Sequence, residues 1–338
     1  MATDHQKRRL RTMADSTTLP KVTVVVPTHA RPELLRILLD SMTKLTYLAS
    51  QLEVIVVHNK TDDRVESVVN ECARTAPFPI RYFRVIYDGR NPNPSRKLGV
   101  SKATGSIIAF TDDDCVVTPE WVTSGVACFR PGIGIVQGRT LPNLDQPRRL
   151  LEHTIEITEE TGFYETCNIF YRKEALEEKG AFADDPIYFG EDTVLGLNVK
   201  ERGYALTFCE EALVYHEVVP ITFMQWLLKP GIGLHGMSAL PKLIRQVPAL
   251  RERMFLRYFL HARTALFDLL LLGLLLSALL HPLCLLLALP YIIYRYCEPY
   301  RVKNPLVRIA RILFGTPRAF VLFAALAIGS IRHRTLIL

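Results

Sequence analysis

The chain of 338 residues is 49% hydrophobic and 22% charged, with 41 Lys+Arg against 34 Asp+Glu. This composition excludes a disordered or collagen-like chain, and the length allows one large catalytic domain with an appendage or two ordinary domains. Residues 217–338 hold 15 Lys+Arg and 4 Asp+Glu, which leaves 26 and 30 in residues 1–216. Basic residues that border apolar runs usually lie against anionic lipid headgroups. The charge distribution therefore predicts a membrane partner and no nucleic acid.

The seven cysteines are odd in number, widely spaced and without a CxxC pair. They predict neither a zinc site nor a disulfide framework, and they fit a reducing cytosol. Residues 1–20 are polar and basic without an apolar core. We expect a disordered lead-in there rather than a secretory signal.

Short β-branched runs alternate with amphipathic stretches in the first third of the chain. Strands are predicted at 21–26, 53–57, 80–86 and 107–110, and helices at 32–42, 62–74 and 95–103. Further along, strands are predicted at 167–171 and 205–215, and helices at 172–179 and 192–202. The alternation predicts an α/β fold of βαβ units on a mainly parallel sheet. Ligands of such sheets bind beyond the carboxyl ends of the strands, here 28–31, 58–63 and 111–114.

Three consecutive carboxylates, Asp112, Asp113 and Asp114, follow a buried apolar strand. Adjacent like charges are unfavourable unless something positive binds them, and Mg²⁺ takes carboxylate oxygens together with substrate phosphates. The alternative is an ordinary solvated strand end.

The chain resembles glycosyltransferase family 2, the inverting nucleotide-sugar transferases with the GT-A fold, over residues 21–217. The motifs that resemble the family stand in its order: VTVVVPTHARPELL, EVIVVHNKTDD, PSRKLGVSKATGSIIAFTDDDCVVTPEW, NIFYRKEALEEKGAF, FGEDTVLGLNVKERGY and VYH. No single motif is specific, but the complete ordered set is.

The resemblance implies three groups of site residues. The nucleotide-sugar-binding residues are Thr28, Arg31, His58, Asn59, Arg96, Asp112 and Asp113. The metal ligands are Asp112, Asp114 and His216. The catalytic pair is Glu191 and Asp192, with Asp192 as the base.

The chemistry needs such groups. A divalent cation, Mg²⁺ or Mn²⁺, can stabilise the charge that develops on the departing nucleoside diphosphate. The attacking hydroxyl must lose a proton, which a carboxylate within hydrogen-bond reach accepts. Glu191 and Asp192 could alternatively be acidic residues that favour a helix start, and both roles can coexist. His216 could alternatively be a structural histidine that ends a strand.

The chain departs from the family pattern in three places. His58-Asn59 replaces the Asp that usually contacts the base, which leaves the identity of the nucleotide open, with Asp62 or Asp63 as the candidate substitute. Lys97 follows Arg96 where Asn is usual, and Thr166-Cys167 replaces a Gly-Gly pair.

Residues 218–263 are expected to form amphipathic interfacial helices, with a packed helical subdomain as the alternative. Residues 264–338 are predicted to hold transmembrane helices. One reading is a single span over 269–289 with a kink at Pro282; the other is a hairpin that turns at His281-Pro282. Flanking Arg and Lys favour the hairpin with both ends in the cytosol. Residues 319–331 are apolar but shorter, and are expected to form a third helix, either re-entrant or interfacial.

Together these features predict a membrane-anchored, multi-pass glycosyltransferase whose catalytic domain faces the cytoplasm. Its donor is a nucleotide sugar, and its acceptor is lipid-linked or membrane-proximal. The QxxRW motif of processive synthases is absent, which disfavours polymerisation. One alternative is a catalytically silent GT-A-like membrane scaffold. A nucleotidyltransferase is the other, but PTHARPE lacks the Gly-rich phosphate loop expected of it.

Overall fold

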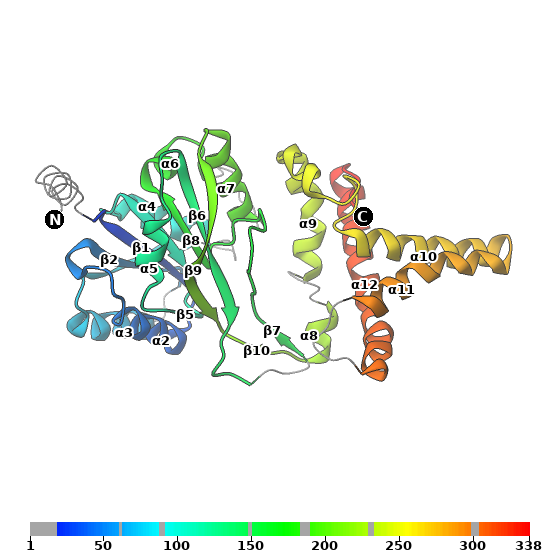
Figure 1. The fold of residues 1–338 in the computed structure, drawn as a ribbon, viewed down its shortest axis with the longest axis horizontal. Helices are drawn as coiled ribbons and strands as arrows, with labels where there is room; N and C mark the ends of the chain where they lie inside the picture. The colour runs from blue at the N-terminus through cyan, green and yellow to red at the C-terminus, as the bar shows by residue number, and fades with distance from the viewer. Residues whose placement is uncertain are drawn as a thin grey trace, which may run out of the picture. The chain divides into compact units, whose positions relative to one another are not determined.

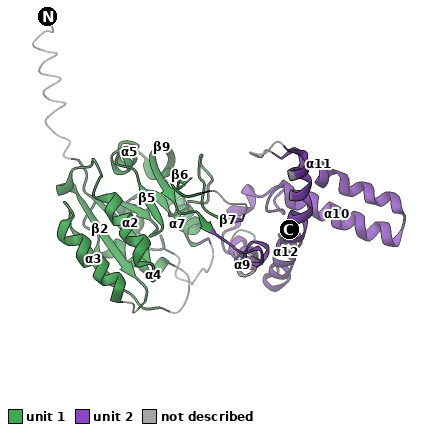
Figure 2. Ribbon diagram, turned by 90° about the horizontal axis from the view of Figure 1, so that it is seen from below, with its two compact units in different colours: residues 1–148, 153–186, 191–219 green, residues 149–152, 187–190, 220–338 purple. Residues whose placement is uncertain are grey.

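The structure is a computed structural model that describes residues 19–60, 63–87, 92–147, 151–182, 190–228, 233–298 and 304–338. The predicted lead-in lies outside the described residues, except for Leu19 and Pro20, and so does Asp62. The chain divides into two compact units (Figure 2). Unit 1 comprises residues 1–148, 153–186 and 191–219, and unit 2 comprises residues 149–152, 187–190 and 220–338.

Within the described residues, unit 1 is built on an eight-stranded sheet in the order β3-β2-β1-β4-β8-β6-β9-β5 (Figure 1). Its strands are β1 Val22–Thr28, β2 Leu52–His58, β3 Ile80–Arg84, β4 Ile107–Thr111, β5 Cys115–Val117, β6 Ile133–Pro142, β8 Asn168–Arg172 and β9 Ala205–His216. Strands β3, β2, β1 and β4 run parallel, β8 is antiparallel to both of its neighbours, and β5 is antiparallel to β9. This arrangement confirms the predicted α/β class with a mixed, mainly parallel sheet.

Helices cover the sheet of unit 1. They are α2 Pro32–Met42, α3 Asp63–Thr75, α4 Asn93–Lys102, α5 Trp121–Ala127, α6 Lys173–Glu177 and α7 Glu191–Glu201. Every residue of β1 and β2 is buried, as expected for central parallel strands between two helical layers. A Cβ on Gly99 would lie 2.3 Å from Val25 Cγ1, so only glycine lets α4 approach β1 this closely. That close packing fixes the position of Arg96 on the same helix.

The sequence did not predict β5, β6 or α5, although β6 lies inside the sheet. Strand β6 has the sequence IGIVQGRTLP, in which polar residues interrupt the apolar run. Gln137 is buried because its side-chain amide donates to the carbonyl oxygen of Asn168 at 2.8 Å and of Glu165 at 3.2 Å. Such tertiary hydrogen bonds satisfy a buried polar group, and hydropathy does not reveal them.

Unit 2 is mainly helical. Its elements are α8 Phe223–Leu228, α9 Gly233–Gln246, η2 Pro248–Arg253, α10 Ala262–Leu279, η3 Pro282–Ala288, α11 Leu289–Cys297 and α12 Pro305–His333. Strands β7 Glu152–His153 and β10 Val219–Pro220 form a separate two-stranded sheet where the chain passes between the units. Helix α12 is longer than the helix predicted at 319–331.

The chain turns back between α10 and η3, so that α10 and α11 lie side by side (Figure 1). A Cβ on Gly273 would lie 2.9 Å from the carbonyl oxygen of Cys284, which places the two arms in direct contact. This geometry is that of the hairpin alternative rather than of a single kinked helix. Whether the hairpin enters a membrane stays a prediction.

By length and composition alone, two of the described helical segments could cross a membrane: Ala262–Leu279 and Arg308–His333. Within their most apolar windows, 17% and 22% of the residues are buried, which is little for core helices of a soluble protein. Exposed leucines include Leu275 and Leu279 of α10. The segment 282–297 is also apolar but shorter.

Candidate active site

The site lies at the carboxyl ends of the central parallel strands of unit 1. Thr28 ends β1 and pairs in register with His58, which ends β2. Asp112 follows β4, the other neighbour of β1. Parallel pairing therefore brings the three predicted ligand-binding segments to one edge of the sheet.

Asp113 organises the turn after β1. Its Oδ2 accepts a hydrogen bond from the Thr28 hydroxyl at 2.6 Å and one from the His29 backbone N–H at 3.4 Å. Its Oδ1 lies 2.6 Å from Nη2 of Arg31, and the carboxylate is completely buried. Burial raises the pKa of Asp113 to about 6, although Arg31 and the Thr28 hydroxyl both lower it. Asp113 thus faces the protein, whereas its two neighbours are partly exposed.

Arg31 bridges the second and third aspartates. Besides Asp113, its guanidinium donates from Nη1 to Asp114 Oδ2 at 2.6 Å. The Arg31 side chain is 44% exposed, so it can leave these carboxylates without a large burial cost. It supplies positive charge at the place where the sequence predicted that something positive must bind.

Asp114 and His216 form a cluster suited to a divalent cation. The antiparallel pairing of β5 with β9 places His216 opposite Cys115, and Nε2 of His216 lies 3.5 Å from Asp114 Oδ1. Nδ1 of His216 lies 2.9 Å from the carbonyl oxygen of Glu217, which can only accept. Nδ1 therefore carries a proton and, in the neutral ring, Nε2 carries the lone pair that a metal needs. Ligand atoms of Asp114, Cys115 and His216 lie within 4.8 Å of one another.

The donor set fits a hard divalent cation at Asp114 and His216. The Asp114 Oδ1 atom is buried and has no hydrogen-bond partner among the described residues, so it has an acceptor position to offer. Cys115 is a poor ligand because complete burial raises its pKa well above the ordinary value, and the thiolate is the ligand form. Asp112, predicted as a ligand, is absent from this cluster, and its Oδ1 lies 3.4 Å from Nη2 of Arg96.

Arg96 connects the aspartate motif to the predicted catalytic pair. Its side chain is 4% exposed, and its Nη1 donates to Glu191 Oε1 at 3.2 Å. One buried guanidinium therefore neutralises Asp112 and Glu191 together. The structure thus brings Arg96, Asp112 and Glu191 to one place.

Asp192 lies in the first turn of α7, next to Glu191. Its Oδ1 accepts a hydrogen bond from the backbone N–H of Thr193 at 2.8 Å, so the helix start fixes the carboxylate. Burial and the charge of Glu191 raise the pKa of Asp192 to about 8, against the lowering effect of Arg96. A carboxyl group with so high a pKa accepts a proton from a hydroxyl more readily than an ordinary carboxylate.

His58 and Asn59, both predicted to bind the nucleotide sugar, are buried. His58 is 0% exposed, and its Nδ1 lies 3.1 Å from the Tyr82 hydroxyl. The side-chain oxygen of Asn59 lies 2.6 Å from Nδ1 of His29, an exposed residue that sequence reasoning did not single out. His29 lies between Thr28 and Arg31 in the turn that follows β1, and this position could have indicated it as a candidate site residue.

Tyr171 is another residue that sequence reasoning missed. It is fully buried on β8, within electrostatic range of Asp192 and Arg96, and its hydroxyl has no hydrogen-bond partner among the described residues. Trp121 of α5 belongs to the hydrophobic core of unit 1. It is buried, and its indole N–H donates to Asn168 Oδ1 at 2.8 Å.

Comparisons with known proteins agree with this architecture. The family model described as "Glycosyl transferase family 2" matches residues 23–180, and the one described as "Glycosyl transferase family group 2" matches residues 107–328. The chain is 26% identical over 223 residues to "Glycosyltransferase AglE" of Haloferax volcanii, covering 61% of this chain and 69% of that protein. It is 31% identical over 96 residues to "GalNAc(5)-diNAcBac-PP-undecaprenol beta-1,3-glucosyltransferase" of Campylobacter jejuni, covering 28% of this chain and 30% of that protein.

Among solved structures, the chain is similar to "Mannosyltransferase PcManGT from Pyrobaculum calidifontis in complex with GDP-Man and Mn2+". The TM-score is 0.55 at 16% identity, with 98% of this chain and 94% of that chain covered. At this identity the likeness concerns the fold. One family model spans more than half of the chain, and the fold agrees with it. The chain therefore belongs to the family 2 group of glycosyltransferases and has the GT-A fold.

Proposed function

We propose that the protein is an inverting, non-processive glycosyltransferase that moves a sugar from a nucleotide-sugar donor to a lipid-linked or membrane-proximal acceptor. The single observation that carries the proposal is the placement of Asp192. This carboxyl group, with a pKa raised to about 8, lies beside a buried arginine that contacts the aspartate motif. A proton acceptor and a diphosphate-binding edge therefore occupy one site.

The donor side rests on the edge formed by Thr28, Arg31, Asn59 and Asp112. A divalent cation held at Asp114 and His216 would offset the negative charge that develops on the departing diphosphate. The Pyrobaculum calidifontis mannosyltransferase was solved with Mn²⁺ and GDP-mannose, which supports Mn²⁺ or Mg²⁺ here. Arg96 holds Asp112 and Glu191 in place, and Arg31 can turn from the aspartates toward the phosphates.

On the acceptor side, Asp192 takes the proton of the attacking hydroxyl. Its fixed position at the start of α7 restricts the direction of attack to one face of the sugar, as inversion requires. Glu191 contacts Arg96, and the negative charge of Glu191 raises the pKa of Asp192.

A membrane-proximal acceptor is supported by the apolar helices of unit 2. Their leucines are exposed, and basic residues flank the hairpin at Arg263 and Arg295 but not at its turn. By the positive-inside rule, this pattern favours a hairpin with both ends, and hence the catalytic unit, on the cytosolic side. The Campylobacter jejuni relative is named for an undecaprenol-linked acceptor, which supports a lipid-linked acceptor here.

The proposal is tested by screening nucleoside diphosphate sugars with the full chain in detergent and Mn²⁺. We expect one donor to raise the Tm and to be hydrolysed slowly without an acceptor, and EDTA should abolish both effects. Asp192→Asn should retain nucleotide binding and lose turnover. Asp40→Asn is the matched control, because Asp40 is an exposed carboxylate on α2 that belongs to none of the proposed site residues.

Turnover of Asp192→Asn at the wild-type rate would contradict the assignment of the base. Calorimetry that shows no metal-dependent binding of any nucleoside diphosphate would instead support the silent scaffold.

A further inference from the structure

Unit 2 contains a cavity of about 690 Å³ that the catalytic chemistry does not use. Helices α8, α10, α11 and α12 all contribute to its lining, and most of the lining is apolar. Its volume is in the range of small-molecule sites, which usually combine apolar walls with a few convergent polar groups. Three arginines, Arg263, Arg295 and Arg318, line this cavity.

The three guanidinium groups form one cluster. Arg263 lies 3.4 Å from the Glu298 carboxylate, which also pairs with Arg295. Arg318 lies within electrostatic range of both Arg263 and Arg295. Counted over the described residues alone, the cluster and Asp268, the carboxylate in the described lining, bring together three positive and two negative groups. These described groups therefore carry more positive than negative charge next to an apolar cavity.

Two contacts hold these arginines in place. The guanidinium of Arg318 lies over the Trp226 ring, 5.0 Å from its centroid. A Cβ on Gly315 would lie 2.7 Å from Nη2 of Arg295, so glycine lets this guanidinium approach the backbone of α12. Both residues are thus positioned before any ligand arrives, which lowers the entropic cost of binding.

A buried hydroxyl in the wall of the cavity also needs an acceptor. Tyr291 lines the cavity and is 1% exposed, and its hydroxyl has no hydrogen-bond partner among the described residues. Leaving such a group unpaired costs free energy that a ligand oxygen would recover. Arginine is the side chain best suited to phosphate oxygens, because its planar fork donates two hydrogen bonds at once.

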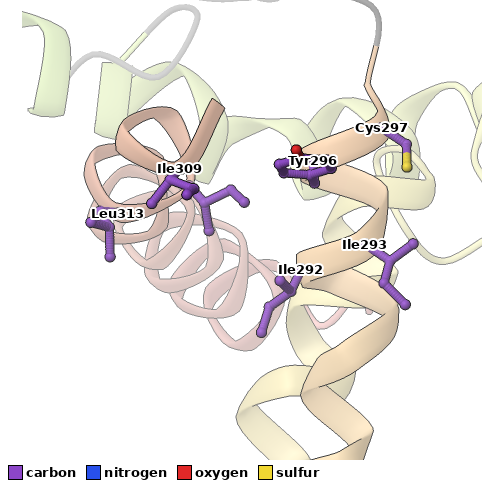
Figure 3. A pocket seen from close by; sticks show the side chains of 7 residues that line it. Ile292, Ile293, Tyr296, Cys297, Ile309 and Leu313 are labelled. Atoms are coloured by element: carbon purple, nitrogen blue, oxygen red, sulfur yellow. The ribbon is translucent and has the colours of Figure 1, made fainter. Parts of the chain in front are cut away.

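A second pocket in the same unit serves as a contrast. Figure 3 shows Ile292 and Tyr296 of α11 facing Ile309 and Leu313 of α12 around a space of about 350 Å³. Its described lining residues include no charged side chain. That pocket can accept a hydrocarbon chain but offers nothing that recognises an anion.

From these observations we infer that the arginine-lined cavity binds the phosphate end of a single-chain isoprenoid lipid, the acceptor carrier of the proposed reaction. The apolar walls take the first part of the chain, and Arg263, Arg295 and Arg318 take the phosphate. Ionisable residues on apolar helices that could enter a bilayer generally mark functional sites, as these arginines do here. The inference deepens the proposed function and rests on it for the role of the lipid, though not for the binding itself.

The chain offers a direct readout of binding. It contains only two tryptophans, Trp121 buried in the core of unit 1 and Trp226 at the cavity. The probe is farnesyl phosphate, titrated into the full chain in neutral detergent while tryptophan emission is recorded. We expect a saturable change that is absent from Trp226→Phe. Farnesol should bind at least about tenfold more weakly, because it lacks the charged oxygens that the guanidiniums recognise.

Variants locate the site. Arg318→Gln and Arg295→Gln should each weaken farnesyl phosphate binding by about tenfold or more, and Arg318→Lys should weaken it less. Arg257→Gln is the matched control, because the Arg257 side chain is 70% exposed and does not line the cavity. It should bind farnesyl phosphate as the wild type does.

Equal affinity of the wild type for farnesol and farnesyl phosphate would overturn the inference, and this comparison needs no variant. Wild-type affinity in both glutamine variants would do so as well. A further arm adds phosphatidylglycerol to the micelles. Competition at equal concentration would show a general headgroup site and overturn the assignment to the isoprenoid carrier.

The binding of nucleoside diphosphates with Mn²⁺ is measured separately on the wild type. If only the nucleoside diphosphates fail to bind, the proposed function is contradicted and the lipid-phosphate site is not. If only farnesyl phosphate fails to bind, the lipid-phosphate site is contradicted and the proposed function is not.

Discussion

The Arg96 guanidinium donates to Glu191 at 3.2 Å, although the two residues are far apart in the sequence. Arg96 lies on α4, which is packed against β1 through Gly99, whereas Glu191 begins α7. Through this contact and the one to Asp112, a buried guanidinium links the aspartate motif to the carboxylates that begin α7. The position of Asp192 relative to the sheet therefore depends on Arg96.

We expect Arg96→Gln to be inactive and less stable than the wild type. Removing the guanidinium leaves Asp112 and Glu191 without their shared counter-charge, a loss of about 3 kcal/mol by analogy with other broken buried pairs. Urea denaturation followed by circular dichroism measures the change. A variant as stable as the wild type would show that water replaces the guanidinium.

Stability should depend on pH through Asp192. Its folded pKa of about 8 exceeds the ordinary value of about 4. The stability that this protonated group contributes is complete below about pH 4 and is lost as the pH rises through 8. Because Asn cannot ionise, Asp192→Asn should melt at a higher temperature than the wild type at pH 8.5, and the two should converge near pH 4. Thermal melts in EDTA measure this, and a lower Tm for the variant at pH 8.5 would contradict the raised pKa.

The rate of sugar transfer should also depend on the ionisation of Asp192, but it should rise with pH where the stability falls. A general base acts when ionised, so kcat/KM of the wild type should rise with pH and level off above about 8. Initial rates between pH 6 and pH 9.5 at saturating Mn²⁺ test this. A flat profile across that range would assign proton removal to another group.

Asp114→Ala should reduce turnover on the order of 100-fold or more, because the cluster with His216 loses its carboxylate. Binding of the nucleoside diphosphate should also lose its dependence on Mn²⁺, which titration calorimetry measures directly. His216→Ala should weaken Mn²⁺ dependence in the same direction. Metal dependence that survives in both variants would place the cation elsewhere.

Membrane association is tested with exposed apolar residues of similar exposure in the two units. Leu275 on α10 is 56% exposed and Ile37 on α2 is 51% exposed, so an arginine at either costs little in water. In a bilayer core, arginine costs about 3 kcal/mol on insertion scales. We expect Leu275→Arg to reduce flotation with liposomes and Ile37→Arg to leave it unchanged. Equal flotation of both variants would mean that α10 does not enter the lipid.

Much of the sheet could be predicted because strands such as β1 and β2 are buried on both sides and read as unbroken β-branched runs. Strand β6 could not, since its Gln137 and Thr140 are polar and become buried only through hydrogen bonds to distant residues. Helix α5 is short and carries Gly125, so neither its length nor its composition marks it.

The candidate site also has residues that the sequence could indicate and contacts that it could not. The aspartates and the Glu191-Asp192 pair could be proposed as site residues because the motifs around them resemble those of the family. The ion pairs of Arg31 with Asp113 and Asp114 could not, because they depend on the turn after β1, where Ala30 adopts a positive φ of 53°. The three arginines of the unit 2 cluster lie on three different helices, and local sequence patterns do not show that these helices come together.

Strand β9 ends at His216 and lies between β6 and β5. During synthesis, the aspartates therefore leave the ribosome well before the histidine that completes their cluster. The proposed cation site is therefore incomplete until β9, the last strand of this sheet in chain order, has been synthesised. Under the proposed assignment, chains that stop short of His216 should fail to bind the metal, so metal binding would report whether unit 1 has been completed.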